Sequence, residues 1–76
     1  MATYNNVAIV QTFASSNSQN AWANVAGVGW LQIQTGAPDA VTNLFVMFNA
    51  AKANGRTMTV ITSATSPPLI VTAYMN

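Results

Sequence analysis

The sequence contains few residues that could carry out chemistry. It has no histidine, no cysteine, one carboxylate side chain (Asp39) and two cationic side chains (Lys52 and Arg56) among 76 residues. General acid–base catalysis needs a group that titrates near neutral pH or a pair of carboxylates, and a serine or threonine nucleophile needs a base beside it. Metal sites need clustered cysteine, histidine or carboxylate ligands. We therefore expect no enzymatic activity, no metal ion and no other cofactor.

Charge of either sign is scarce. Only 4% of the residues are charged and the net charge is +1, whereas about a quarter of the residues of an average domain are charged. Proteins that bind nucleic acid normally cluster several lysines and arginines to neutralise phosphates. We therefore expect no nucleic-acid partner, and a surface covered mainly by uncharged amides and hydroxyls.

Long hydrophobic runs are also missing. Although 51% of the residues are hydrophobic, no uninterrupted stretch approaches the ~20 residues of a membrane span, so we expect no membrane insertion. The first six residues lack a cationic segment followed by an apolar one, which predicts no signal peptide. Without cysteines, the redox state of the compartment cannot be inferred either, and the localisation is unknown.

The clearest expected element is a helix from Pro38 to Ala53. Proline is favoured in the first turn, where Asp39 also faces the positive end of the helix dipole. The pair Asn54–Gly55 tolerates the left-handed conformation that ends helices. Lys52 and Arg56 then lie near the C-terminus, where cations are favourable. All three charged residues thus have a structural explanation.

This helix is expected to present two different faces. The face toward the core is an apolar stripe with helical spacing, formed by Val41, Leu44, Phe45, Phe48 and Ala51. Ala40 and Met47 widen this stripe. Val46 and Ala50 fall on the opposite face, beside Asn43 and Asn49. Two interpretations remain open, a solvent-exposed valine or a contact with another subunit, for which the candidate interface residues are Asn43, Val46, Met47 and Ala50.

Five strands are expected around the helix in one domain, residues 1–76. They are Val7–Ala14, Ala21–Ala26 and Val28–Gln34 before the helix and Thr57–Thr62 and Leu69–Met75 after it, with loops at Ser15–Asn20 and Ser63–Pro68. Alternation in the first strand predicts Val7, Ile9 and Phe13 on one face. The chain is therefore predicted to be mainly β with one helix in the order β-β-β-α-β-β. This is the order of a small OB-fold barrel; the alternative is an α+β antiparallel sheet with one packed helix.

The stretch from Ala37 to Tyr74 resembles a known family. An Ala-Pro pair, an apolar helix, Ala-Asn-Gly, a Thr/Val strand and the segment Pro68-Leu69-Ile70-Val71-Thr72 follow one another as in the B subunits of bacterial A-B toxins, particularly the subtilase-cytotoxin and pertussis-like branch. The resemblance implies an OB-fold subunit in a secreted homopentamer, with helices lining the pore, an outer surface that binds host glycans and a catalytic A chain as partner. Members of this family usually have a signal peptide, a disulfide and a longer N-terminal segment with sugar-binding residues. This sequence lacks them, so only the scaffold carries over.

Two tryptophans are the candidate binding residues. An exposed indole can stack on the apolar face of a sugar while neighbouring amides bond its hydroxyls. Trp22 is flanked by Asn20 and Asn24, and Trp30 shares a strand face with Gln32. Alternatively, Trp22 anchors the loop, and Trp30 packs against an adjacent strand or a neighbouring subunit. Because charge is scarce, a neutral glycan is expected.

Three functions follow from these expectations. The first is a non-catalytic, ring-forming subunit that binds carbohydrate on its outer surface. The alternative is a structural self-assembly module without a small ligand. The third, single-stranded nucleic-acid binding, would require stacking aromatics in a basic groove, which two cations cannot build.

Overall fold

The computed structural model describes all residues from Met1 to Asn76. It has five strands and one helix: β1 (Ala2–Ala14), β2 (Ala21–Val25), β3 (Gly29–Ile33), α1 (Pro38–Asn54), β4 (Thr57–Thr62) and β5 (Leu69–Met75). The predicted mainly β class and the β-β-β-α-β-β order are confirmed. The first strand is longer than predicted, because it begins at Ala2 instead of Val7.

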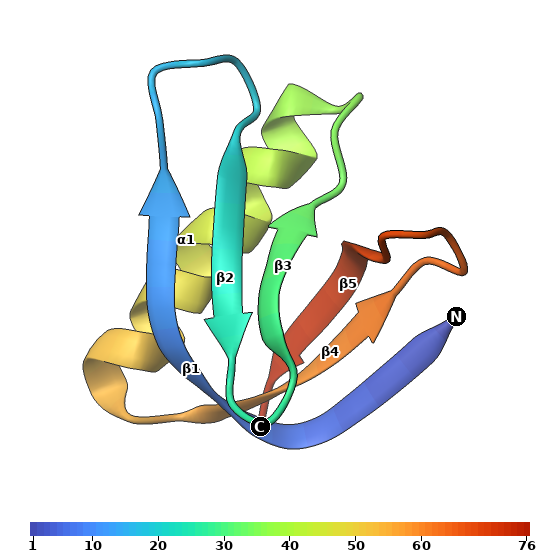
Figure 1. Cartoon of the computed structure of the whole chain (residues 1–76). Coiled ribbons are helices and arrows are strands. Elements are labelled where there is room, and N and C mark those ends of the chain that lie inside the picture. Colours follow the sequence, from blue (N-terminus) through green and yellow to red (C-terminus); the bar gives the residue numbers. More distant parts are fainter.

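The five strands close into a barrel in the order β1-β2-β3-β5-β4. β1 is long and curved, so that its first part pairs with β4 and its second part with β2 (Figure 1). Neighbouring strands are antiparallel except β3 and β5, which pair in parallel over two positions only, Gln32 with Leu69 and Ile33 with Ile70. The alternative of an antiparallel sheet is therefore wrong at this one pairing.

Two irregularities bend β1. Tyr4 lies opposite Val60 and Val7 opposite Met58, so β1 has one extra residue there. Within this segment Asn6 has a φ of 52°, a left-handed conformation that asparagine adopts more readily than most residues. The second irregularity is a bulge between Ile9 and Gln11.

The second bulge changes which side chains face outward. Ile9 lies opposite Val25 and Gln11 opposite Asn24, which leaves Val10 as the extra residue. Since side chains alternate along a strand, one extra residue reverses the alternation beyond it. Ile9 is accordingly buried, whereas Phe13 is 49% exposed. The predicted placement of Phe13 on the face of Ile9 is wrong for this reason.

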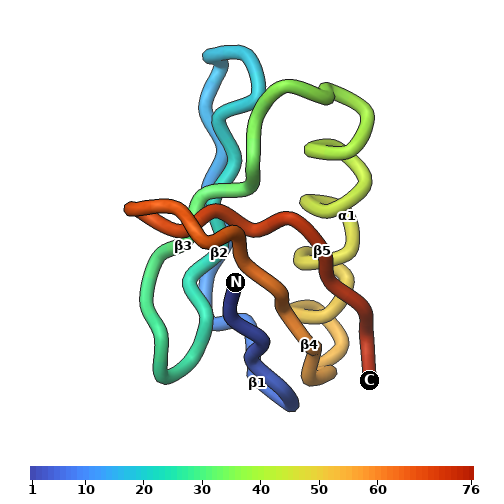
Figure 2. Tube along the Cα trace, turned by 90° about the vertical axis from the view of Figure 1, so that its right-hand side faces the viewer, coloured from blue at the N-terminus to red at the C-terminus, as the bar shows by residue number.

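Helix α1 packs along one side of the barrel (Figure 2). Its ends are as predicted to within one residue: Pro38 and Asp39 lie in the first turn, Lys52 lies in the last, and Gly55 follows with a φ of 64°. The Arg56 amide caps the helix by donating to the Ala51 carbonyl. The Arg56 guanidinium instead donates to the main-chain carbonyl of Asn76, so it links the start of β4 to the end of β5.

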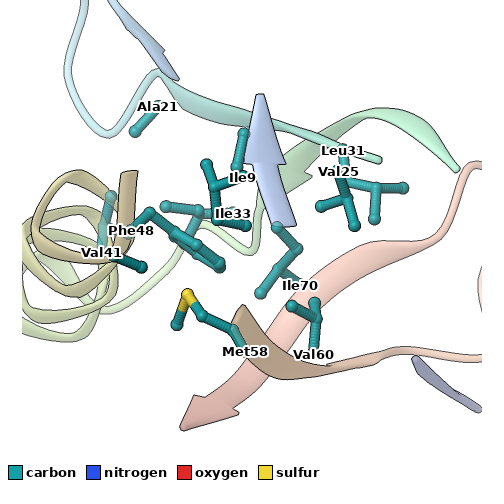
Figure 3. Close-up of a cluster of buried hydrophobic side chains, with 12 residues drawn as sticks. Ile9, Ala21, Val25, Leu31, Ile33, Val41, Phe48, Met58, Val60 and Ile70 are labelled. Atoms are coloured by element: carbon teal, nitrogen blue, oxygen red, sulfur yellow. The ribbon is translucent and has the colours of Figure 1, made fainter. Parts of the chain in front are cut away.

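The core lies between α1 and the inner faces of the strands. Phe48 and Val41 of the helix point toward Ile9, Ile33 and Ile70 of three strands (Figure 3). Other members of the buried cluster are Ala21, Ala23, Val25, Leu31, Ala51, Met58 and Val60. Leu44, Phe45 and Met47 are half-buried against it. Ala40, predicted to widen the core face, is exposed, although the adjacent Val41 is buried.

A polar contact also joins the helix to the barrel. The Thr12 hydroxyl donates to Asn49 Oδ1 at 2.6 Å, and Asn49 Nδ2 donates to the Phe45 carbonyl at 2.9 Å. Asn49 is half-buried, so the prediction that it lies on the outer polar face is corrected. α1 is neither long nor apolar enough to cross a membrane.

Candidate functional site

The outer surface of β1, β2 and β3 gathers aromatic and amide side chains in two rows. In the first row, Phe13 lies opposite Trp22, which lies opposite Gln32. In the second row, Gln11 lies opposite Asn24, which lies opposite Trp30. Directly opposite residues share a face of the sheet, and diagonal neighbours are within reach of aromatic side chains. We call these six residues, together with Asn20, which precedes β2 and accepts a hydrogen bond from Trp22, the aromatic face.

Four residues of the aromatic face line an open hollow. They are Phe13, Asn20, Trp22 and Trp30, and the hollow measures about 490 Å³. Phe13 is 49% and Trp30 45% exposed, and Trp22 is half-buried. Exposed large apolar side chains that adjoin one another mark contact surfaces more often than isolated ones do. The hollow is therefore the strongest candidate for a binding site.

Asn20 fixes one wall of this hollow. Trp22 Nε1 donates to Asn20 Oδ1 at 2.8 Å, and Asn20 Nδ2 donates to Ser15 Oγ at 2.8 Å. The indole N–H of Trp22 is thus engaged within the protein. Its apolar ring remains for contact with a ligand, in an orientation set by the loop between β1 and β2.

The second row has a looser amide arrangement. Asn24 Nδ2 donates to Gln11 Oε1 at 3.2 Å, and this pair is exposed. The structure gives the Gln32 side chain no hydrogen bond within the protein. These amides are available to bond groups that project beyond the hollow.

All five residues named from the sequence lie on this one face. Asn20, Trp22 and Trp30 line the hollow, while Asn24 and Gln32 border it. Phe13 was not among them, because simple alternation placed it on the same strand face as Ile9, which is buried. No spacing of apolar and polar residues reveals the bulge at Val10, since Val10 and Phe13 are both apolar.

The face carries no charge and no metal-ligand cluster. Asp39, Lys52 and Arg56 are all outside the set of residues that line the hollow. No group of three or more histidine, cysteine, aspartate or glutamate side chains could hold a metal ion. A ligand would therefore be recognised by aromatic contact and by uncharged hydrogen bonds.

The outer face of α1 is a second candidate surface. Val46 is 62% exposed and Asn43 is exposed, while Ala50 is half-buried. Met47 is half-buried and packs against the core, so its side chain is less exposed to solvent than that of Val46. Beside Val46, a smaller hollow of about 260 Å³ lies between the helix and the β1–β2 loop. Of the candidate interface residues, only Asn43 and Val46 are thus fully available to a partner.

No protein-family model matches this sequence, and no curated protein matches it. A proposal for its function therefore rests on the aromatic face, on the barrel and on the resemblance in the second half of the chain.

Proposed function

We propose that this protein is a non-catalytic OB-fold subunit that assembles into a ring and binds a neutral carbohydrate on its aromatic face. The hollow formed by Phe13, Asn20, Trp22 and Trp30 carries the proposal. Sugar rings have apolar faces that stack on aromatic side chains, and their hydroxyls bond to amides. An uncharged site with three aromatic side chains and adjacent amides suits such a ligand.

The order of the strands supports the OB-fold assignment. The OB-fold is a five-stranded barrel with a helix between its third and fourth strands. This protein has the same number of strands and the same position of the helix. In OB-folds the face formed by strands 2 and 3 and the adjoining loops binds oligonucleotides and oligosaccharides. The aromatic face occupies the same position, and its lack of cations favours sugars over nucleic acid.

Unpaired strand edges support assembly. Beyond Ile70, no strand pairs with β5 on the side away from β4, and β3 is unpaired on its β5 side before Gln32. Free strand edges readily pair with another chain. Pairing of β5 in one copy with β3 in the next would join two different surfaces, and such head-to-tail contacts close into rings when the rotation permits. The number five, secretion and a catalytic A chain come from the family resemblance alone.

Glycan-array binding by the wild-type protein and by Trp22→Ala tests the carbohydrate site. We expect the wild type to be retained on a subset of neutral glycans and the variant to lose much of that retention, because one of the three aromatic side chains that line the hollow is gone. Thr57→Ala is the control, since Thr57 is exposed on β4 and lies outside both the aromatic face and the helix face. Retention of no glycan at high protein concentration, or equal retention of Trp22→Ala in a folded state, would overturn the proposal.

Native mass spectrometry tests the ring separately. The monomer has a mass of 8.0 kDa, and we expect a species of five times that mass at micromolar concentration. A monomer alone would contradict ring assembly without contradicting glycan binding.

A self-assembly module without a small ligand is the second candidate. It is favoured by the exposed apolar side chains Val10, Phe13, Trp30 and Val46 and by the low net charge, which does not oppose association. This function predicts a high-mass species together with an empty glycan array. It also predicts that Trp30→Ala lowers the mass of the assembly.

A further inference from the structure

The hollow on the aromatic face has few groups that can form hydrogen bonds. Three of its four lining residues are aromatic, and the fourth, Asn20, is already bonded to Trp22 and Ser15. An amide offers two N–H donors and two acceptor lone pairs. Asn20 therefore has one donor and one acceptor left, and the only other free donor among the lining side chains is Trp30 Nε1, for which the structure gives no hydrogen bond. A ligand group seated in this hollow meets mainly aromatic carbon.

This imbalance matters for a sugar. A hexose carries hydroxyls around most of its ring, and a hydroxyl removed from water without a new partner is unfavourable. A methyl group in the same position would instead gain from leaving water. The amides that could satisfy hydroxyls, those of Gln11, Asn24 and Gln32, border the hollow instead of lining it.

We infer that the group bound in the hollow is the methyl group of a methyl-bearing sugar. Two kinds of sugar supply this chemistry: a 6-deoxyhexose, whose methyl is attached to the ring, and an N-acetylhexosamine, whose methyl is attached to an amide. The second would use the remaining donor and acceptor of Asn20. The inference rests on the proposed carbohydrate function and specifies its ligand class.

Three matched glycosides, whose common aglycone carries no methyl group, test the inference. They are 2-hydroxyethyl β-galactoside, its 6-deoxy derivative and its 2-acetamido-2-deoxy derivative, with the corresponding gluco series run in parallel. Binding is followed by ligand-observed NMR and by titration of the fluorescence of the two tryptophans. We expect at least one methyl-bearing derivative to bind about tenfold more tightly than its parent hexoside, since it replaces an unpaired hydroxyl or adds an apolar contact. The derivative that gains affinity identifies the source of the methyl group.

A variant pair checks that the hollow causes the preference. Phe13→Gln adds a donor and an acceptor to the hollow, and Phe13 is exposed enough for the fold to tolerate the change. We expect the ratio of affinities between methyl-bearing and parent sugars to fall toward one. Thr57→Ala lies outside the aromatic face and should leave the ratio unchanged.

The outcomes separate the inference from the proposed function. If both parent hexosides bind as tightly as their derivatives, the inference is overturned and carbohydrate binding stands. If the protein binds array glycans that contain no methyl-bearing sugar, the same conclusion follows. If no glycoside and no array glycan binds, both are overturned.

Discussion

The outer face of β1–β3 and the outer face of α1 were both expected to be contact surfaces, and they differ in how they are built. The aromatic face combines side chains from three strands, with Phe13, Trp22 and Trp30 around one hollow. The helix face draws on one segment, where Val46 is the only large apolar side chain that is strongly exposed. Strands about 4.8 Å apart bring distant residues into one cluster, whereas a helix face can present only its own residues.

The difference has a consequence for binding. A surface that converges from several strands can enclose part of a small ligand, and its hydrogen bonds can be fixed by neighbouring loops, as Ser15 and Asn20 fix Trp22. A convex helix face with one valine can support contact only with a large partner. We therefore assign the ligand to the sheet and leave the helix face to assembly. Four predictions test this division.

The largest effect on stability is expected for Phe48→Ala, which we compare with Phe13→Ala. Phe48 of α1 is fully buried, so Phe48→Ala should lower the free energy of unfolding by about 3–5 kcal/mol, a large part of what a domain of this size has. Phe13→Ala should change it by less than about 1 kcal/mol, because the side chain is half exposed. It should nevertheless weaken glycan binding about tenfold. Urea denaturation and glycan titration measure the two effects. Equal destabilisation by both variants would place Phe13 in the core and contradict its assignment to the binding face.

Val46→Asp tests whether the helix face takes part in assembly. In a ring whose helices line the pore, the variant brings one new negative charge per subunit close together. We expect it to dissociate the ring at low ionic strength, and we expect about 1 M salt to restore the ring, since salt screens charges over about 3 Å at that concentration. Thr57→Asp is the control, because Thr57 is exposed on β4, which is paired on both sides. Sedimentation velocity that shows the same mass for Val46→Asp at every salt concentration would remove the helix face from the interface.

Thr12→Val tests the polar link between the two surfaces. The change removes the hydroxyl that donates to Asn49 Oδ1, and we expect a loss of about 1 kcal/mol, seen as a fall in Tm of roughly 4–8 °C. Thr62→Val is the matched control, since Thr62 is fully buried and its hydroxyl has no partner. That variant should be neutral or stabilising. If both variants lose the same stability, the Thr12–Asn49 bond contributes nothing specific.

The smallest effect is expected at the border of the aromatic face. Asn24→Ala removes an exposed hydrogen bond to Gln11 and should change glycan affinity by less than about threefold. Asn20→Ala, by contrast, frees the Trp22 indole and should weaken binding by about tenfold. Isothermal titration with the best array glycan measures both. A larger loss at Asn24 than at Asn20 would move the binding site from the hollow to the second row of the face.

Most of the fold could be predicted from the sequence because its local signals agree. Pro38 and Asp39 begin the helix and Gly55 ends it, as expected from their backbone and charge preferences. The β-branched runs of β4 and β5 fall at the predicted residues. The closure of the barrel depends on contacts between distant strands, such as β3 with β5, and no local pattern specifies a parallel pairing of two positions.

The candidate site could be predicted in part. Trp22 and Trp30 were identified because aromatic residues beside amides are visible in the sequence, and alternation placed Trp30 outward correctly. Phe13 was missed because the bulge at Val10 cannot be read from apolar and polar residues, both Val10 and Phe13 being apolar. Asn49 was misplaced because its inward hydrogen bond depends on Thr12, 37 residues earlier.

The bulge at Val10 also bears on how this surface could change over evolutionary time. Val10 is the extra residue, so loss of its codon would leave Gln11 directly after Ile9 with regular alternation. Gln11 and Phe13 would still face outward and Thr12 inward, so the hollow and the contact with the helix would both persist. Relatives of this protein should therefore tolerate the loss of this residue, whereas one further inserted residue before Phe13 in a regular strand would turn Phe13 inward.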